Sequence, residues 1–97
     1  MSIARVYYMH AKEGRTAELE SGLRNLVEKV SRIAGSHGAE LLRDTGNERQ
    51  FMLIERWEDL EAHKASKAEF AKIDMGSIME SLEGPPAATY FDSLAAA

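Results

Sequence analysis

Residues 51–54, Phe-Met-Leu-Ile, constrain the fold of this chain more than any other segment. Successive side chains of a β-strand point to opposite sides, so four consecutive apolar residues give a strand that is apolar on both faces. Such a strand needs cover on both faces, and one small domain of 97 residues has little material for that purpose. The run therefore predicts a small α+β domain, residues 1–97, that is covered on one side by a second copy of itself.

The composition excludes several classes of protein. The 12 basic and 16 acidic residues are mixed along the chain, the net charge is -4, and no basic cluster indicates a nucleic-acid partner. No apolar run approaches the ~20 residues that span a bilayer, so no membrane partner is expected. The absence of cysteine excludes disulfides, thiol catalysis and cysteine-ligated metals. Without a signal-peptide pattern, the expected location is the cytoplasm.

Strand and helix patterns alternate along the chain in the order β-α-β-β-α-β. Apolar residues at spacings of four, three, four and three line one face of a first helix: Leu19, Leu23, Leu26, Val30 and Ile33. That helix begins at Arg15 and ends before Gly35. The other expected elements are strands over 3–11, 36–44, 50–57 and 88–94 and helices over 60–72 and 75–83, with residues 94–97 as a frayed tail.

Turn and capping residues support these boundaries. Gly14 follows Lys12-Glu13 in a turn, and residues 45–49 form a polar hairpin connection. Asp59 and Asp74 are placed to cap the two parts of the second helical region, which Gly84-Pro85-Pro86 ends. Gly38 predicts a bulge in the second strand.

The order of elements predicts a ferredoxin-like βαββαβ fold, in which a four-stranded antiparallel sheet carries helices on one face and the second helix is split. Two helical regions cover only one face of such a sheet. At about 25 cal/mol per Å2, leaving the apolar residues of the other face in water costs several kcal/mol. A homodimer through that sheet face removes this cost.

Four segments, in this order, together resemble one known family: the turn Lys12-Glu13-Gly14, the segment 40–44 (Glu-Leu-Leu-Arg-Asp), the pattern Phe51-x-x-x-Glu55-x-Trp57, and Gly84-Pro85-Pro86 before the last strand. The chain resembles the antibiotic biosynthesis monooxygenase superfamily of dimeric α/β barrels, which includes small quinol monooxygenases. The resemblance implies a dimeric barrel that oxidises a small aromatic or quinol compound without a metal, a flavin or another cofactor.

The chain departs from the family pattern after Trp57. There the family usually has a leucine three residues before a histidine, then Ser-Pro-His. Here His63 stands at the leucine position and Ser66 at the first histidine position, while Glu69 and Phe70 fall near the second. Haem-degrading members use an asparagine, a tryptophan and a histidine. The second helical region has no tryptophan, and no histidine follows His63, so haem degradation is disfavoured as the function.

His63 is the candidate catalytic residue. On a helical wheel it lies amid Leu60, Ser66, Phe70 and Ile73, so its side chain is expected to point toward the sheet. A neutral imidazole with a pKa near ~6.5 suits the removal of a proton from a phenolic hydroxyl. The alternative is a core histidine that bonds to Glu55, Tyr7 or a backbone carbonyl.

Other residues are candidates for substrate binding: Glu55, Trp57, Tyr7, Tyr90, Phe70 and Ser66. Glu55 shares a strand face with Trp57, and a buried carboxylate there needs a partner such as Arg5, Arg43 or His63. Neighbouring strands are expected to carry Tyr7, Tyr8 and Tyr90, and one or more of these can present a hydroxyl to the pocket. The alternative for each tyrosine is a role in packing alone, with its hydroxyl satisfied. No metal site is predicted, because His10, His37 and His63 have no ligand spacing.

The leading hypothesis is a cofactor-independent monooxygenase acting on a small aromatic or quinol compound in a pocket between sheet and helices. The same scaffold also suits an isomerase or lyase of a small carbonyl compound, which would form product without oxygen. A non-catalytic dimeric binding protein is the third possibility. It predicts a cavity filled by Met79, Phe70 and tyrosine side chains and too small for a ring.

Overall fold

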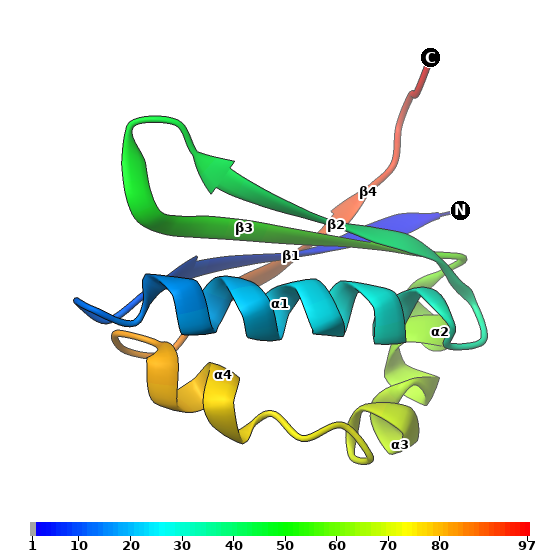
Figure 1. The fold of residues 1–97 in the computed structure, drawn as a ribbon. Coiled ribbons are helices and arrows are strands. Elements are labelled where there is room, and N and C mark those ends of the chain that lie inside the picture. Colours follow the sequence, from blue (N-terminus) through cyan, green and yellow to red (C-terminus); the bar gives the residue numbers. More distant parts are fainter. Residues whose placement is uncertain (1) are drawn as a thin grey trace.

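The computed structural model describes residues 2–97, which form one layer of strands and one layer of helices (Figure 1). The elements are β1 (Ile3–His10), α1 (Thr16–Ser31), β2 (Ser36–Asp44), β3 (Asn47–Trp57), α2 (Leu60–Ala65), α3 (Lys67–Phe70), α4 (Gly76–Ser81) and β4 (Ala87–Asp92). This is the predicted βαββαβ order with a divided second helical region, and the fold is the ferredoxin-like α+β arrangement.

The four strands form one antiparallel sheet in the order β2-β3-β1-β4. The helices lie together on one face of this sheet (Figure 1). Within the chain the sheet is open, with β2 and β4 at its edges. The predicted barrel would therefore form only with a second chain.

The register of β1 and β3 decides which side chains face the helices. Ile3, Arg5, Tyr7 and Met9 of β1 lie opposite Trp57, Glu55, Leu53 and Phe51 of β3. These four β3 residues are at most 1% exposed, because α1 and the second helical region cover them. Glu55 is the carboxylate in this otherwise apolar row, so the strand that builds the core also carries a titratable group into it.

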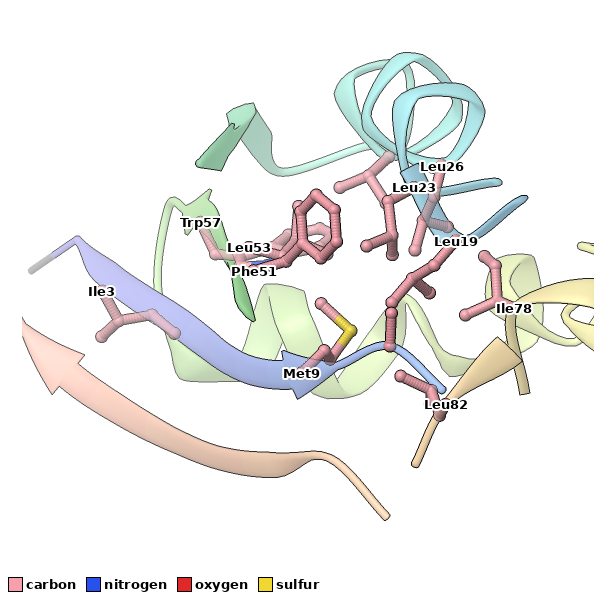
Figure 2. Packing of buried hydrophobic residues seen from close by; sticks show 12 residues of the cluster. Ile3, Met9, Leu19, Leu23, Leu26, Phe51, Leu53, Trp57, Ile78 and Leu82 are labelled. Atoms are coloured by element: carbon pink, nitrogen blue, oxygen red, sulfur yellow. The ribbon is translucent and has the colours of Figure 1, made fainter. Parts of the chain in front are cut away.

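α1 supplies the helix side of the core, as its apolar periodicity predicts. Leu19, Leu23 and Leu26 point from α1 toward the sheet and its Phe51 (Figure 2), and Val30 is buried on the same helix. Burying one such side chain contributes roughly 1.5–3 kcal/mol. α4 extends this core with Ile78, and Leu82 follows directly after that helix.

The second helical region is shorter and more divided than its apolar pattern predicts. A continuous helix over 60–72 was expected, but the chain has a break at Ser66, whose hydroxyl donates a hydrogen bond to the backbone oxygen of His63. A serine that bonds to a preceding carbonyl competes with the regular helix ladder. α4 ends at Ser81 instead of Glu83, because Leu82 is extended and pairs with Ala11.

The turns lie where the sequence predicts them, but the β2–β3 hairpin turn is shorter than predicted. The hairpin between β2 and β3 has only Thr45 and Gly46 outside the strands, not residues 45–49, and the Gly46 N–H bonds to the Asp44 carboxylate at 2.7 Å. The predicted bulge is present at Gly38, where φ is +111° and the register between β2 and β3 shifts.

The sheet face away from the helices carries apolar side chains in cross-strand rows. One row joins Tyr8 of β1, Met52 of β3 and Leu42 of β2. Tyr8 and Leu42 are 42% and 37% exposed, and Phe91 of β4 is 50% exposed. We call this surface the outer sheet face.

Candidate functional site

A pocket of about 560 Å3 lies where β1 and β4 meet α2 and α3. Its volume is within the range of small-molecule sites, roughly 300–1,000 Å3. We call it the outer pocket. It is lined by Arg5, Tyr7, His63, Lys64, Ser66, Lys67, Phe70 and Tyr90.

His63 enters this pocket from α2. The Asp59 carboxylate caps that helix by accepting a hydrogen bond from the Ala62 N–H at 2.8 Å, as the sequence predicts. The His63 side chain is 13% exposed, and its Nδ1 lies 2.8 Å from the hydroxyl of Tyr90 on β4. The predicted orientation toward the sheet is confirmed, although the hydrogen-bond partner is Tyr90 and not Glu55, Tyr7 or a backbone carbonyl.

The surroundings of His63 favour the neutral imidazole. Burial lowers the pKa of His63 below its ordinary value, and the nearby Arg5 cation lowers that pKa further. The ring is therefore mainly uncharged at pH 7. Its second nitrogen, Nε2, lies 3.8 Å from Oε1 of Glu55, which is too long for a hydrogen bond but close for an electrostatic interaction.

Glu55 is a buried carboxyl group behind the histidine. Burial raises the pKa of Glu55 to about 7, while a hydrogen bond from Trp57 and the Arg5 cation act in the opposite direction. The Trp57 indole N–H donates to Oε1 of Glu55 at 3.2 Å. Arg43, which the sequence offered as a partner for Glu55, forms its ion pair with Glu20 instead.

Arg5 also lines the outer pocket, although the sequence suggested it only as a partner for Glu55. Its guanidinium carbon lies 4.1 Å from the ring centre of Tyr90 and 5.2 Å from that of Tyr7, both within the range of cation–π contacts. Within residues 2–97 its buried Nε has no hydrogen-bond partner, and the guanidinium is in none of the ion pairs. The sequence feature that could have indicated Arg5 as a pocket residue is its position in β1, on the same strand face as Tyr7.

A second, smaller space lies deeper between the sheet and the helices. It measures about 110 Å3, has mainly apolar walls that include Met75 and Met79, and also touches Glu55. We call it the inner cavity. Tyr7 and Phe70 line both this cavity and the outer pocket. An apolar cavity of about 150 Å3 accommodates benzene, so the inner cavity is small for a substituted ring.

The structure brings five of the seven predicted site residues to the outer pocket: His63, Tyr7, Tyr90, Phe70 and Ser66. Trp57 and Glu55 do not line it. Trp57 is fully buried and packs edge-on against the His63 ring, with ring centres 5.3 Å apart, so it supports the histidine instead of forming a wall. Tyr8 lies on the outer sheet face. Sequence reasoning missed Lys64 and Lys67, which resemble ordinary surface lysines.

No group of three potential metal-ligating side chains occurs within residues 2–97. His10 bonds to Gln50 at 3.0 Å and lies 3.6 Å from Glu83, while His37 is exposed on β2. The three histidines therefore do not converge. None of the helices in the same part of the chain has the length and hydropathy needed to cross a bilayer.

Comparison with known proteins agrees with the fold and the sequence pattern. The sequence profile described as antibiotic biosynthesis monooxygenase matches residues 2–69, which is more than half of the chain. The chain therefore belongs to the antibiotic biosynthesis monooxygenase family. No curated protein matches it at a significant level.

Three solved structures illustrate how widely this fold is shared. SnoaB, a cofactor-independent oxygenase from Streptomyces nogalater, is 18% identical with a TM-score of 0.83, covering 98% of this chain and 95% of its own. PA3566 from Pseudomonas aeruginosa is 24% identical (TM-score 0.82, 97% and 95% covered). Rv0793 from Mycobacterium tuberculosis is 18% identical (TM-score 0.80, 100% and 99% covered). At these identities the likeness concerns the fold.

Proposed function

We propose that the protein is a cofactor-independent monooxygenase that oxidises a small aromatic or quinol compound in the outer pocket. One observation carries the proposal. A neutral imidazole, His63, is hydrogen-bonded to the hydroxyl of Tyr90 in a pocket with aromatic walls. Membership of the family and the oxygenase name of SnoaB agree with this reaction class.

The arrangement suits removal of a proton from a phenolic substrate. Because Glu55 lies near Nε2 of His63, the tautomer with hydrogen on Nε2 is favoured and leaves Nδ1 as an acceptor. Nδ1 then accepts a hydrogen bond from Tyr90, which in turn accepts the substrate proton. His63 is the base, and Tyr90 passes the proton to it.

The oxidation needs no electrons beyond those of the substrate. A deprotonated hydroquinone is electron-rich enough to donate electrons to O2 and form a carbon–oxygen bond. The resulting peroxide loses water to give a hydroxyquinone, so one oxygen atom enters the ring and the other leaves as water. Hydroquinone plus O2 thus equals hydroxyquinone plus H2O.

Replacing His63 tests this proposal. Loss of a general base lowers a rate by about 100-fold to 10,000-fold, so we expect the kcat/KM of His63→Ala to fall by about 100-fold or more in O2-uptake assays with a hydroquinone panel. His37→Ala is the control, because His37 is exposed outside the pocket and should retain full activity. No O2 uptake by the unaltered protein, full activity in His63→Ala, or product formation without oxygen would each refute it.

We further propose that two chains associate through the outer sheet face. The apolar row of Tyr8, Met52 and Leu42, together with Phe91, would otherwise face water. Burial of such side chains contributes about 25 cal/mol per Å2. A second copy offers the same surface and covers both sheets at once.

A matched pair of leucines tests this association. Leu42 on the outer sheet face and Leu60 on α2 are both 37% exposed in a single chain. We expect Leu42→Lys to shift the protein from dimer to monomer in sedimentation at micromolar concentration, because it places a charge in the interface, while Leu60→Lys stays dimeric. A monomeric unaltered protein, or equal behaviour of the two variants, would contradict the proposal.

A further inference from the structure

The ionisable side chains of the outer pocket are unlike those of the chain as a whole. The chain has a net charge of -4, yet Arg5, Lys64 and Lys67 all line the pocket, and no aspartate or glutamate of residues 2–97 does so. Glu55, the carboxyl nearest in the sheet register, lies across from Arg5 but borders the inner cavity. The pocket is therefore a local region of positive charge within an acidic protein.

Arg5 is the best-placed of these cations to recognise a ligand. The rings of Tyr90 and Tyr7 hold its guanidinium from two strands, so the side chain loses little freedom when it binds. Arg5 takes part in none of the ion pairs formed within residues 2–97, and its buried Nε is unsatisfied. Arg5 as a whole is only partly buried, but its Nε is buried without a partner, and a carboxylate beside it would supply both a hydrogen-bond acceptor and a negative charge.

The neighbouring aromatic walls restrict the shape of such an anion. Tyr7, Tyr90 and Phe70 present ring surfaces to the same space, and aromatic side chains favour flat apolar partners. Lys64 and Lys67 project from the α2–α3 region onto the same pocket, where they would attract an anion from solution.

We infer that the outer pocket is selective for aromatic acids, with Arg5 binding the carboxylate and His63–Tyr90 facing a ring hydroxyl. This inference rests on the proposed function, which supplies the reaction that the bound ligand undergoes. It goes beyond that function by naming the substrate class, a hydroxylated aromatic carboxylate.

Binding without turnover tests the inference. Calorimetry under nitrogen at pH 7 compares 2,5-dihydroxybenzoate with its uncharged analogue 2,5-dihydroxybenzamide. We expect the acid to bind at least about tenfold more tightly at low salt, because charge-assisted bonds are stronger than neutral ones. That advantage should shrink as salt is added, since part of it comes from exposed lysines. Equal affinity for the two compounds, or no binding of the acid, would overturn the inference.

Arg5→Gln should lower the preference for the acid to the salt-sensitive part that the lysines supply and leave binding of the amide unchanged, while Lys29→Gln, at an exposed position on α1, should alter neither. If Arg5→Gln does not fold, Lys64→Gln/Lys67→Gln should still lower the affinity for the acid at low salt and not that for the amide. An undiminished preference in the folded Arg5→Gln variant, or an unchanged affinity of the double-lysine variant for the acid when Arg5→Gln does not fold, would also overturn the inference. Selective binding of the acid without O2 uptake would contradict only the proposed oxidation, and turnover of uncharged hydroquinone without any preference would contradict only the inference.

Discussion

Gly35→Ala is expected to destabilise the protein by roughly 3 kcal/mol and to lower its activity. Gly35 has φ +84°, a conformation that costs other residues about 1–2 kcal/mol. A Cβ there would lie 2.7 Å from Cβ of Ala62, so overpacking adds roughly 1–3 kcal/mol. Because Ala62 precedes His63, relief of this clash moves α2 and displaces the imidazole. Urea unfolding and O2 uptake measure the two effects.

Gly14→Ala is the matched control for this prediction. Gly14 has nearly the same φ, +80°, but no atom lies within 4 Å of the position its Cβ would take. It should therefore cost only the backbone strain, about 1–2 kcal/mol. Ala62→Gly should partly rescue Gly35→Ala, because it removes the atom that clashes. Equal destabilisation by the two alanines, or no rescue, would show that Gly35 is not a packing contact between α2 and the start of β2.

The sequence predicted those elements whose signals are local or periodic. The spacing of Leu19, Leu23 and Leu26 led to α1, and the apolar run 51–54 led to β3, because both patterns reflect burial on a regular backbone. The order of these elements then left one sheet topology as the simplest. The break at Ser66 was missed because it depends on a side-chain bond to a backbone oxygen that competes with helix propensity.

The candidate site was only partly accessible from the sequence. His63 stood out as a polar residue on an apolar helix face, which is a periodic signal. Its pairing with Tyr90 depends on the register between β1 and β4, which brings Tyr90 opposite Arg5. The same register holds Arg5 between two tyrosine rings. Register is a non-local property, so Arg5 could be considered as a partner for Glu55 but not recognised as part of the pocket.

The second large effect concerns Glu55→Gln, which we expect to stabilise the protein by about 3 kcal/mol at pH 9 and hardly at all near pH 4. The folded pKa of Glu55 is raised from 4.5 to about 7 by burial. Below pH 4.5 the carboxyl is protonated in both states, so the folded protein bears no penalty. Between pH 4.5 and 7 only the folded state keeps the proton, and the contribution of Glu55 to stability falls by about 1.4 kcal/mol per pH unit.

Above pH 7 the unaltered protein carries a buried carboxylate, and the penalty becomes constant. Glutamine has nearly the same shape, can still accept the Trp57 hydrogen bond and has no charge to bury. Denaturant unfolding at fixed protein concentration from pH 4 to 9 should show the difference between the two proteins growing up to pH 7. Glu40→Gln, at an exposed position on β2, is the control and should change the stability at pH 9 far less than Glu55→Gln, because it removes no buried charge. A constant difference for Glu55→Gln would contradict the raised pKa.

The same variant separates packing from function. If Glu55 only fills space beside Trp57, glutamine should preserve turnover while it improves stability. If the carboxylate selects the His63 tautomer that accepts the Tyr90 hydrogen bond, kcat should fall even though the fold is more stable. We expect kcat to fall. A buried carboxylate that weakens the fold above pH 7 is typical of a residue that is kept for a role in the site. Higher stability with unchanged kcat would remove Glu55 from the mechanism and leave His63 and Tyr90 to act alone.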